Sequence, residues 1–209
     1  MKRGRYPDLF VISGPSGCGK TTLVQRALSE MDHLVFAVSH TTRKMRHSEV
    51  EGRDYYFVTE DEFKQMIKNQ VFAEWANVHG HYYGTSRKEI EKKDADKGII
   101  LDIDIQGAKQ IKDAYKEALF IFIFPPAFHE LKKRLLDRGD ETPESIGRRL
   151  EVAKKEIQSY PEFDYIIIND RLDEAVKELT AVVLSTGCRA ERRRKEIEPI
   201  LLSFFQEEM

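Results

Sequence analysis

Residues 14–22 read GPSGCGKTT, and the apolar run LFVI occupies positions 9–12 directly before them. Glycine at positions 14 and 19 allows successive backbone N–H groups to turn inward around a phosphate. In such a loop Lys20 reaches the β- and γ-phosphates, and the Thr21 hydroxyl ligates Mg²⁺. Apolar residues at three- and four-residue spacings follow, which predicts a helix whose N-terminal dipole adds to the anion site. Strand, loop and helix together predict a nucleotide-binding P-loop; the alternative is a glycine-rich turn without nucleotide.

Length and composition indicate one domain with subdomains. The chain has 209 residues, and its hydrophobic content of 41% is enough for a substantial core. The longest apolar stretch, 118–127, is about half of a membrane span and contains two prolines, so no membrane segment is expected. The N-terminus has no apolar signal core, and Cys18 and Cys188 cannot form a disulfide framework. A reducing, cytoplasmic location is therefore expected.

The charge pattern argues against a nucleic-acid partner. With 34 basic and 36 acidic residues the formal net charge is −2, so no global field attracts nucleic acid. In the basic segment 189–195 a solvated helix face is favoured over a contact with RNA or an acidic partner. Farther along, apolar residues from Ile197 to Phe205 recur at helical spacings and predict an amphipathic helix that docks on its own or a neighbouring subunit. Monomer and homodimer both stay open.

Short apolar runs recur along the chain, each followed by a helical pattern. They lie at 9–13, 99–103, 119–124 and 164–168, and this alternation predicts a parallel sheet covered by helices. The long interval between the first two runs reads as a separate small lobe. It has its own expected strands near 35–38, 54–58 and 81–85 and an expected helix near 60–69, for which Thr59 is the N-cap.

The polar segment DRGDETPES at 137–145 separates two helical patterns and reads as a mobile flap. One helix is expected to end near Arg138 and the next to begin after Thr142, with Pro143 at its first position. The expected fold is therefore α/β, a three-layer P-loop NTPase-type fold with a central parallel sheet, an inserted mixed α/β lobe and a small helical lid. The expected division is core 1–33, 94–125 and 160–187, lobe 34–93, lid 126–159 and C-terminal helical extension 188–209.

Residues of the inserted lobe suit a second phosphate and a purine base. Arg43 and Arg46 lie close together in sequence, and with the Tyr55 phenol they can hold a dianionic phosphate through charge-assisted bonds. Farther on, Glu74, Tyr83 and Thr85 supply a carboxylate and hydroxyl groups. A guanine ring offers N1–H and an amino group to such a carboxylate. Adenine lacks the N1–H and would leave the carboxylate unpaired, at a cost of about 1–3 kcal/mol.

At this point the chain resembles the guanylate kinase family, which transfers a phosphoryl group from ATP to GMP and so supplies guanine nucleotides. The resemblance runs from Asp8 to about Leu184. Besides the P-loop it rests on SHTTRKMR at 39–46, EVEGRDYYF at 49–57, FAEWANVHGHYYGTS at 72–86, ILDIDIQG at 100–107, LKKRLLDRG at 131–139 and IIIND at 166–170. So many blocks in one order make an accidental likeness negligible.

Carried over position by position, the resemblance implies two substrate sites. The GMP phosphate falls to Arg43, Arg46, Tyr55 and Tyr83, the guanine edge to Ser39, Glu74 and Thr85, with Glu49 and Asp104 in the same GMP set. The ATP site comprises the P-loop residues Gly14, Pro15, Ser16, Gly17, Cys18, Gly19, Lys20, Thr21 and Thr22, with Asn169 bordering the adenine. Departures from the family pattern are Thr85, where serine is frequent, and His40, Lys44 and Met45, which replace small residues or proline.

Asp102 and Asp104 follow the apolar strand at 99–101, at the sheet edge where open α/β folds bind their ligands. Asp102 together with Thr21 is expected in the Mg²⁺ environment, and Asp104 on the GMP side. The alternative for Asp102 is a structural acceptor for loop N–H groups.

Two anions must be brought in line, so cationic groups on a closing lid are expected. Lys20, Arg134, Arg138 and Arg149 are the expected catalytic residues, although the sequence does not say which of Arg148 and Arg149 turns inward. The acceptor phosphate is already anionic near neutral pH, so no general base is needed and none of the six histidines is assigned a catalytic role.

Two competing functions remain. A kinase of the same fold that acts on a ribose bisphosphate would not need Glu74 and Thr85. A guanylate-kinase-like interaction module would bind phosphorylated proteins and would not need the intact Lys20 and Thr21. ATP and GMP, with Mg²⁺, are therefore the expected ligands, and a redox role for Cys18 is disfavoured against that of a filler at a variable motif position.

Overall fold

The computed structural model describes residues 9–78, 80–91, 97–137 and 143–206. Its centre is a five-stranded sheet in the order β2-β7-β1-β8-β9, in which every neighbouring pair is parallel. The strands are β1 Leu9–Ser13, β2 Leu34–Phe36, β7 Gly98–Asp102, β8 Leu119–Phe124 and β9 Tyr165–Ile168. The predicted central parallel sheet is thus confirmed, with each expected apolar run forming one strand.

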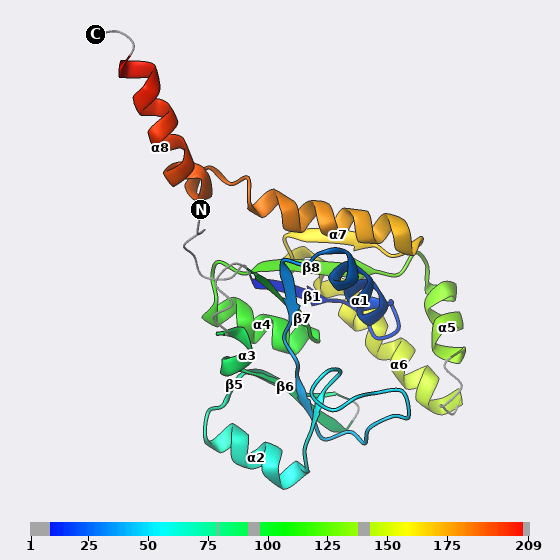
Figure 1. The fold of residues 1–209 in the computed structure, drawn as a ribbon. Coiled ribbons are helices and arrows are strands. Elements are labelled where there is room, and N and C mark those ends of the chain that lie inside the picture. The colour runs from blue at the N-terminus through cyan, green and yellow to red at the C-terminus, as the bar shows by residue number, and fades with distance from the viewer. Residues whose placement is uncertain (1–8, 79, 92–96, 138–142, 207–209) are drawn as a thin grey trace.

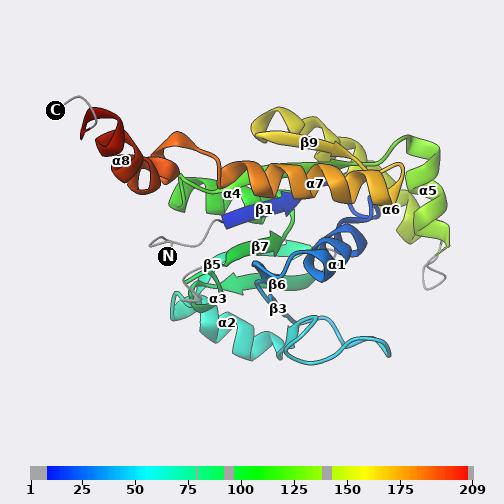
Figure 2. The same ribbon diagram turned by 45° about the horizontal axis from the view of Figure 1, so that its top comes forward.

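Helices cover both faces of this sheet (Figures 1 and 2). On one face α1 (Lys20–Glu30) and α7 (Leu172–Thr186) pack on side chains such as Phe10 and Ile121. On the other face α4 (Ile105–Ala114) packs on Val11 and Leu101. Because successive side chains of a strand point to opposite faces, the near-continuous apolar runs pack against the helices on both faces of the sheet. The expected three-layer arrangement follows from this.

The inserted lobe is built on a second sheet, in the order β4-β3-β6-β5. Its elements are β3 His40–Thr41, β4 Tyr56–Phe57, α2 Glu60–Lys68, β5 Phe72–Val78, β6 His81–Ser86 and α3 Arg87–Ile90. Thr59 caps α2 as predicted, since its side chain accepts from the Glu62 N–H while the Glu62 side chain accepts from the Thr59 N–H.

Two expectations for this region were wrong in detail. The strand expected near 35–38 is β2, which pairs with β7 in the central sheet rather than with the lobe strands. Its three residues carry no local signal that identifies their partner strand. The parallel pairing with β7 places β2 in the central sheet. The strand expected at 54–58 shrinks to Tyr56–Phe57, because the residues before it form a turn in which the Gly52 N–H donates to the Tyr55 carbonyl.

The region expected to form the lid contains α5 (Phe128–Leu136) and α6 (Pro143–Glu156), followed by the 3₁₀ helix Ile157–Glu162. A small apolar cluster, which includes Leu135 and Leu150, holds α5 and α6 together. Helix α6 begins at Pro143 as predicted, and α5 ends at Leu136, before Arg138. The predicted flap lies for the most part outside the described residues, as does Arg138 itself.

The last element is α8 (Ala190–Gln206), which confirms the expected helix but not its docking onto the same subunit. In both ribbon views it extends away from the rest of the molecule (Figures 1 and 2). Its apolar residues are exposed, for example Phe204 at 70%. No helix in the described part of the chain is both long enough and apolar enough to cross a bilayer.

Candidate active site

The P-loop runs from the end of β1 into α1 and is shaped by glycine. Gly19 caps α1 with a φ of 92°, in the left-handed region that favours glycine. A Cβ there would also lie 2.4 Å from Nδ2 of Asn169. The Lys20 ammonium donates to the Gly14 carbonyl at 2.7 Å, so the lysine folds back over the loop that precedes it.

Two side chains from distant segments converge on one P-loop carbonyl. Asn169 Nδ2 donates to the Cys18 carbonyl oxygen at 2.8 Å, and Arg134 Nη1 donates to the same oxygen at 3.1 Å. Arg134 Nη2 also donates to the Asn169 carbonyl oxygen at 2.9 Å. Both residues were expected at ATP, Asn169 beside the adenine and Arg134 over the phosphates. The structure places both against the backbone of the P-loop.

Helix α6 of the lid contacts the P-loop from another direction. Arg149 Nη2 donates to the Ser16 hydroxyl at 2.5 Å, whereas Arg148 is exposed to solvent. This separates the adjacent arginines that the sequence could not distinguish. Glu156 at the end of α6 accepts from the Ser16 N–H at 3.4 Å, and burial raises the pKa of its carboxyl against the opposing effect of Lys20.

Asp102 at the end of β7 faces the start of α1. Its Oδ2 accepts from the Thr21 hydroxyl at 2.8 Å, which brings together the two residues predicted near Mg²⁺. Burial raises the pKa of Asp102, against the lowering effects of Lys20 and Thr21. Burial also opposes the charge of Lys20, but anionic neighbours that include Asp102 outweigh it and raise the pKa of the ammonium. Lys20 is therefore cationic at neutral pH.

In the lobe, three predicted residues form one buried polar cluster. The hydroxyls of Ser39 and Thr85 are 2.9 Å apart, and Glu74 Oε1 accepts from the Thr85 N–H at 2.7 Å. All three residues are buried. Residues from β5, β6 and the segment before β3 thus present two hydroxyls and a carboxylate side by side.

The Glu74 carboxyl is the most strongly perturbed acid of this cluster. Burial raises its pKa to about 7, against the lowering effect of the hydrogen bond from Thr85. Helix α4 comes very close to it, because a Cβ on Gly107 would lie 2.3 Å from Glu74 Oε2. Asp104 accepts from the Gly107 N–H at 2.8 Å and so caps α4 beside Glu74. The folded structure therefore favours the protonated form of Glu74 more than water does.

The arginine loop of the lobe is held by Glu49. Arg43 donates to both Glu49 carboxylate oxygens, at 3.0 and 2.6 Å, and the Arg46 N–H donates to Oε2 at 2.7 Å. Burial would raise the pKa of Glu49, but these bonds outweigh it and lower the pKa. Glu49, which was expected among the GMP-binding residues, thus holds Arg43 and the turn at Arg46.

Two tyrosines lie beside this pair. The Arg43 guanidinium carbon is 5.5 Å from the centre of the Tyr55 ring, and the rings of Tyr55 and Tyr83 are 5.9 Å apart. Burial raises the pKa of Tyr55, with Asp102 and Tyr83 adding to the effect, so its hydroxyl stays a proton donor at neutral pH. Arg46 is exposed, and its backbone rather than its side chain makes the contact with Glu49.

Sequence reasoning missed three contributions to this site. It read Gly107 only as part of a matched block, although the α4 approach to Glu74 requires glycine there. It did not single out Glu156, because the end of α6 contains several charged residues and nothing in the sequence distinguishes this one. It gave Glu49 no arginine partner. A Glu six residues after an Arg in a turn-forming segment was the only local signal for this last pair.

The comparisons with known proteins agree with this geometry. The family model described as guanylate kinase matches residues 6–186. The chain belongs to the guanylate kinase family. A guanylate kinase of Thermotoga maritima is 44% identical over 91% of this chain and 93% of its own, and one of Geobacter metallireducens is 46% identical over 88% and 91%. The crystal structure of guanylate kinase from Anaplasma phagocytophilum matches with a TM-score of 0.76 at 30% identity, covering 94% of this chain and 97% of that one.

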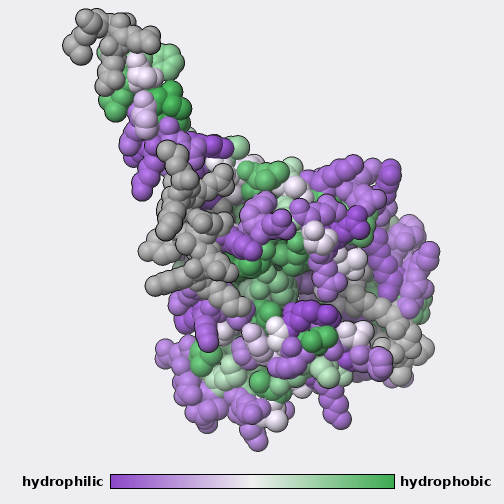
Figure 3. Space-filling view, viewed as in Figure 1, coloured by the Kyte–Doolittle hydropathy of each residue, from purple (hydrophilic) through white to green (hydrophobic). Residues whose placement is uncertain are grey.

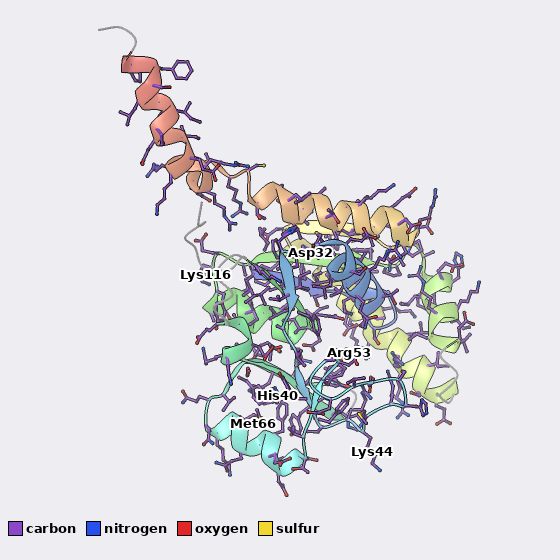
Figure 4. The ribbon with its side chains drawn as sticks, viewed as in Figure 1. Asp32, His40, Lys44, Arg53, Met66 and Lys116 are labelled. Atoms are coloured by element: carbon purple, nitrogen blue, oxygen red, sulfur yellow. The ribbon has the colours of Figure 1, made fainter. Side chains whose placement is uncertain are left out.

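The departures from the guanylate kinase pattern are accommodated in the lobe. His40 lies on β3, with its ring 4.8 Å from that of Tyr56 and 5.6 Å from that of Phe72, so it fills space among aromatic side chains. Lys44 is exposed and points outward from the lobe (Figure 4). Thr85 keeps the hydroxyl that serine would supply and bonds to Ser39. None of these substitutions removes a polar group from the buried cluster.

Proposed function

We propose that this protein transfers the γ-phosphoryl group of ATP to GMP, giving ADP and GDP. The observation that carries the proposal is the buried cluster of Ser39, Glu74 and Thr85 in a chain that also keeps a complete P-loop. A carboxylate acceptor next to hydroxyl donors complements the N1–H, amino group and O6 of guanine. Adenine would leave the buried carboxylate without a hydrogen-bond donor, and the uncompensated desolvation free energy would weaken its binding.

On the donor side, the P-loop N–H groups and Lys20 bind the ATP phosphates. Thr21 and Asp102 offer the hard oxygen ligands that Mg²⁺ prefers, so they fit the ion that accompanies ATP. When bound, Mg²⁺ neutralises phosphate charge. The described residues contain no group of three or more His, Cys, Asp or Glu that could hold a metal ion alone. That supports an ion that arrives with the nucleotide.

Arginines supply the remaining positive charge. Arg149 donates to Ser16 of the P-loop, and from there its guanidinium is to stabilise the charge on the transferred phosphoryl group. Arg134 positions the P-loop through the Cys18 carbonyl. Arg138 lies outside the described residues, and its proposed role as a lid arginine rests on the sequence.

On the acceptor side, Arg43, Arg46, Tyr55 and Tyr83 bind the phosphate of GMP. That phosphate already carries a nucleophilic anionic oxygen near neutral pH, so no side chain has to remove a proton. The residues instead align the two phosphates and stabilise the charge of a loose transition state. Asp104, which caps α4 next to Glu74, fixes the edge of the base pocket.

The function is tested by ADP production with Mg²⁺-ATP and one acceptor at a time. GMP should give turnover, while AMP, CMP and UMP should give less than about 1% of it, since the wrong base forfeits about 3 kcal/mol or more. Turnover with ribose 1,5-bisphosphate alone would identify the sister kinase instead. Nucleotide binding without turnover on any acceptor would favour the interaction module.

Arg149→Ala should lower kcat by about 10²-fold, because it removes one preorganised cation from the transition state. Arg148→Ala is the matched control and should stay within about twofold, because Arg148 is exposed. The kcat values of the two variants, measured at saturating ATP and GMP, show which of the two adjacent arginines acts in the reaction. Equal losses in both variants would contradict the assignment.

Glu49→Gln should raise the KM for GMP by about tenfold and leave the KM for ATP unchanged. The variant loses one charge-assisted acceptor, worth about 1.5–3 kcal/mol, that holds Arg43 and the turn at Arg46. Glu60→Gln on the exposed side of α2 is the control and should change neither constant. A lower KM for GMP would show that the negative charge of Glu49, rather than its positioning of Arg43, dominates.

A further inference from the structure

Strand β5, which carries Glu74, is irregular at the point where that residue stands. In the described sheet β5 is an edge strand that pairs with β6. Phe72 lies opposite Ser86 and Glu74 lies opposite Thr85, so Ala73 is an extra residue that forms a β-bulge. A bulge re-aims the side chains next to it, and a slip by one residue would turn β5 side chains to the other face. The pairing with β6 alone therefore fixes the position of Glu74 weakly.

The outer edge of β5 is bound by one side chain of the core. The Trp75 N–H donates to Gln110 Oε1 at 3.2 Å, and Gln110 Nε2 donates to the Trp75 carbonyl oxygen at 2.7 Å. A carboxamide offers the same N–H and C=O groups as a peptide unit, so Gln110 takes the place of a neighbouring strand at this residue. Its Nε2 also donates to the Gln106 carbonyl oxygen at 3.3 Å, which orients the amide.

Three successive residues of β5 meet α4. Ala73 packs on the apolar cluster that α4 shares with the central sheet. Glu74 lies beside Gly107, where a Cβ would be 2.3 Å from Oε2. Trp75 is bound by Gln110, which follows Gly107 by three residues and so lies on the same face of the helix. One face of a core helix thus accommodates the Glu74 carboxyl and binds the backbone of the next residue.

Hydrophobic contacts also join the lobe to the core. The apolar cluster of the central sheet reaches into the lobe, since it includes Ala37 after β2 and Ile90 of α3. Figure 3 shows hydrophobic residues between the two parts, where the chain leads from β2 into the lobe in Figure 1. Apolar burial is non-directional, whereas hydrogen bonds depend on angle and distance. The two bonds of Gln110 therefore add a positional constraint that apolar packing lacks.

We propose that Gln110 is a positioning residue for guanine recognition. By binding the backbone of Trp75, it holds β5 in the register in which Glu74 faces the base. This inference rests on the proposed function, in which Glu74 accepts from the N1–H and amino group of guanine. Gln110 acts through Glu74 and leaves the P-loop untouched. Its loss should therefore weaken the binding of GMP and spare that of ATP.

The first test removes the hydrogen bonds and keeps the size of the side chain. Gln110→Met, an unbranched residue of high helix propensity, should raise the KM for GMP about tenfold. The kcat and the KM for ATP should stay within about twofold. Gln110→Glu keeps an acceptor but has no donor for the Trp75 carbonyl, so it should raise the same KM.

Gln65→Met and Gln65→Glu, at an exposed position of α2, are the matched controls and should change none of these constants. Thermal unfolding shows whether each variant is folded. An unchanged KM for GMP in a folded Gln110 variant, or an equal rise in the KM for ATP, would overturn the proposal. Loss of folding in both Gln110 variants would overturn it as well, because the role would then be structural.

The second test asks whether Gln110 acts through Glu74. In a Glu74→Gln background, Gln110→Met should lower kcat/KM for GMP about threefold or less, because residues that act through one another are not additive. The full tenfold loss in both backgrounds would show that Gln110 acts independently of Glu74 and would overturn the proposal.

Calorimetric titration with GMP separates this inference from the function on which it rests. The parent should bind GMP about tenfold more tightly than Gln110→Met does. A parent that binds no GMP would refute the proposed function and this inference together. Equal affinity in a parent and a variant that both bind GMP would refute the role of Gln110 alone.

Discussion

Replacing Lys20 with alanine is expected to lower kcat by about 10³-fold or more, because it removes the fixed cation from the phosphates on which negative charge develops. Lys20 lies inside the P-loop with its ammonium bonded to the Gly14 carbonyl, so no other described cation takes its place there. The pKa of the ammonium is raised, and the full charge is therefore lost with the side chain. Steady-state ADP formation measures the effect.

Lys177→Ala, at an exposed position of α7, is the matched control and should retain full turnover. Thermal unfolding of Lys20→Ala tests whether its fold survives. A folded Lys20→Ala variant with turnover within tenfold of the parent would remove Lys20 from the proposed chemistry.

Glu74→Gln is expected to lower kcat/KM for GMP by about 10³-fold, since two guanine donors lose a charged acceptor worth about 1.5–3 kcal/mol for each bond. Binding of ATP should be unchanged, because Glu74 belongs to the lobe. Glu178→Gln on the surface of α7 is the control. The variant is assayed with GMP and AMP as acceptors and by equilibrium binding of ATP. An unchanged preference for GMP would show that Glu74 does not read the base.

The same substitution should stabilise the protein at alkaline pH. The pKa of Glu74 is raised to about 7 from an ordinary value of 4.5, so the fold favours the protonated acid. Its contribution to stability is fully present below pH 4.5 and is lost as the pH rises through 7. At 1.4 kcal/mol per pH unit, the ionised carboxylate destabilises the fold by about 3 kcal/mol at pH 8.

Glutamine is neutral at every pH, so it does not lose stability as the pH rises. The difference in the free energy of unfolding, Glu74→Gln minus parent, should therefore increase between pH 5 and pH 8. Denaturant titrations at the two pH values measure the difference. A constant difference between parent and variant would mean that Glu74 titrates near its ordinary pKa. Together with the loss of GMP turnover, the expected gain would show that the base pocket is held at a cost in stability.

The sequence predicts well what depends on local pattern. Apolar runs such as Leu9–Ser13 and Leu119–Phe124 became central strands, since a strand buried on both faces must be apolar throughout. Pairing partners are not local, so β2 was assigned to the wrong sheet. The alternating strand β5 was missed because its residues were read for their chemistry rather than for their period of two.

The candidate site shows the same division. Motifs supplied the residue types at Ser39, Glu74 and Thr85, and the fold then brought them into contact. Motif spacing could not tell Arg148 from Arg149, because that depends on the rotation of α6 against the P-loop. It also could not show that Asn169 binds the Cys18 carbonyl, a contact between residues 151 positions apart.

That carbonyl joins three parts of the molecule. Arg134 comes from the lid helix α5, Asn169 from the end of β9, and Cys18 from the phosphate-binding loop. The position of the lid and the shape of the loop are therefore thermodynamically linked. A nucleotide that binds one loop shape more tightly also favours the lid position that fits this shape. By the same coupling free energy, stabilising that lid position raises the affinity for the nucleotide.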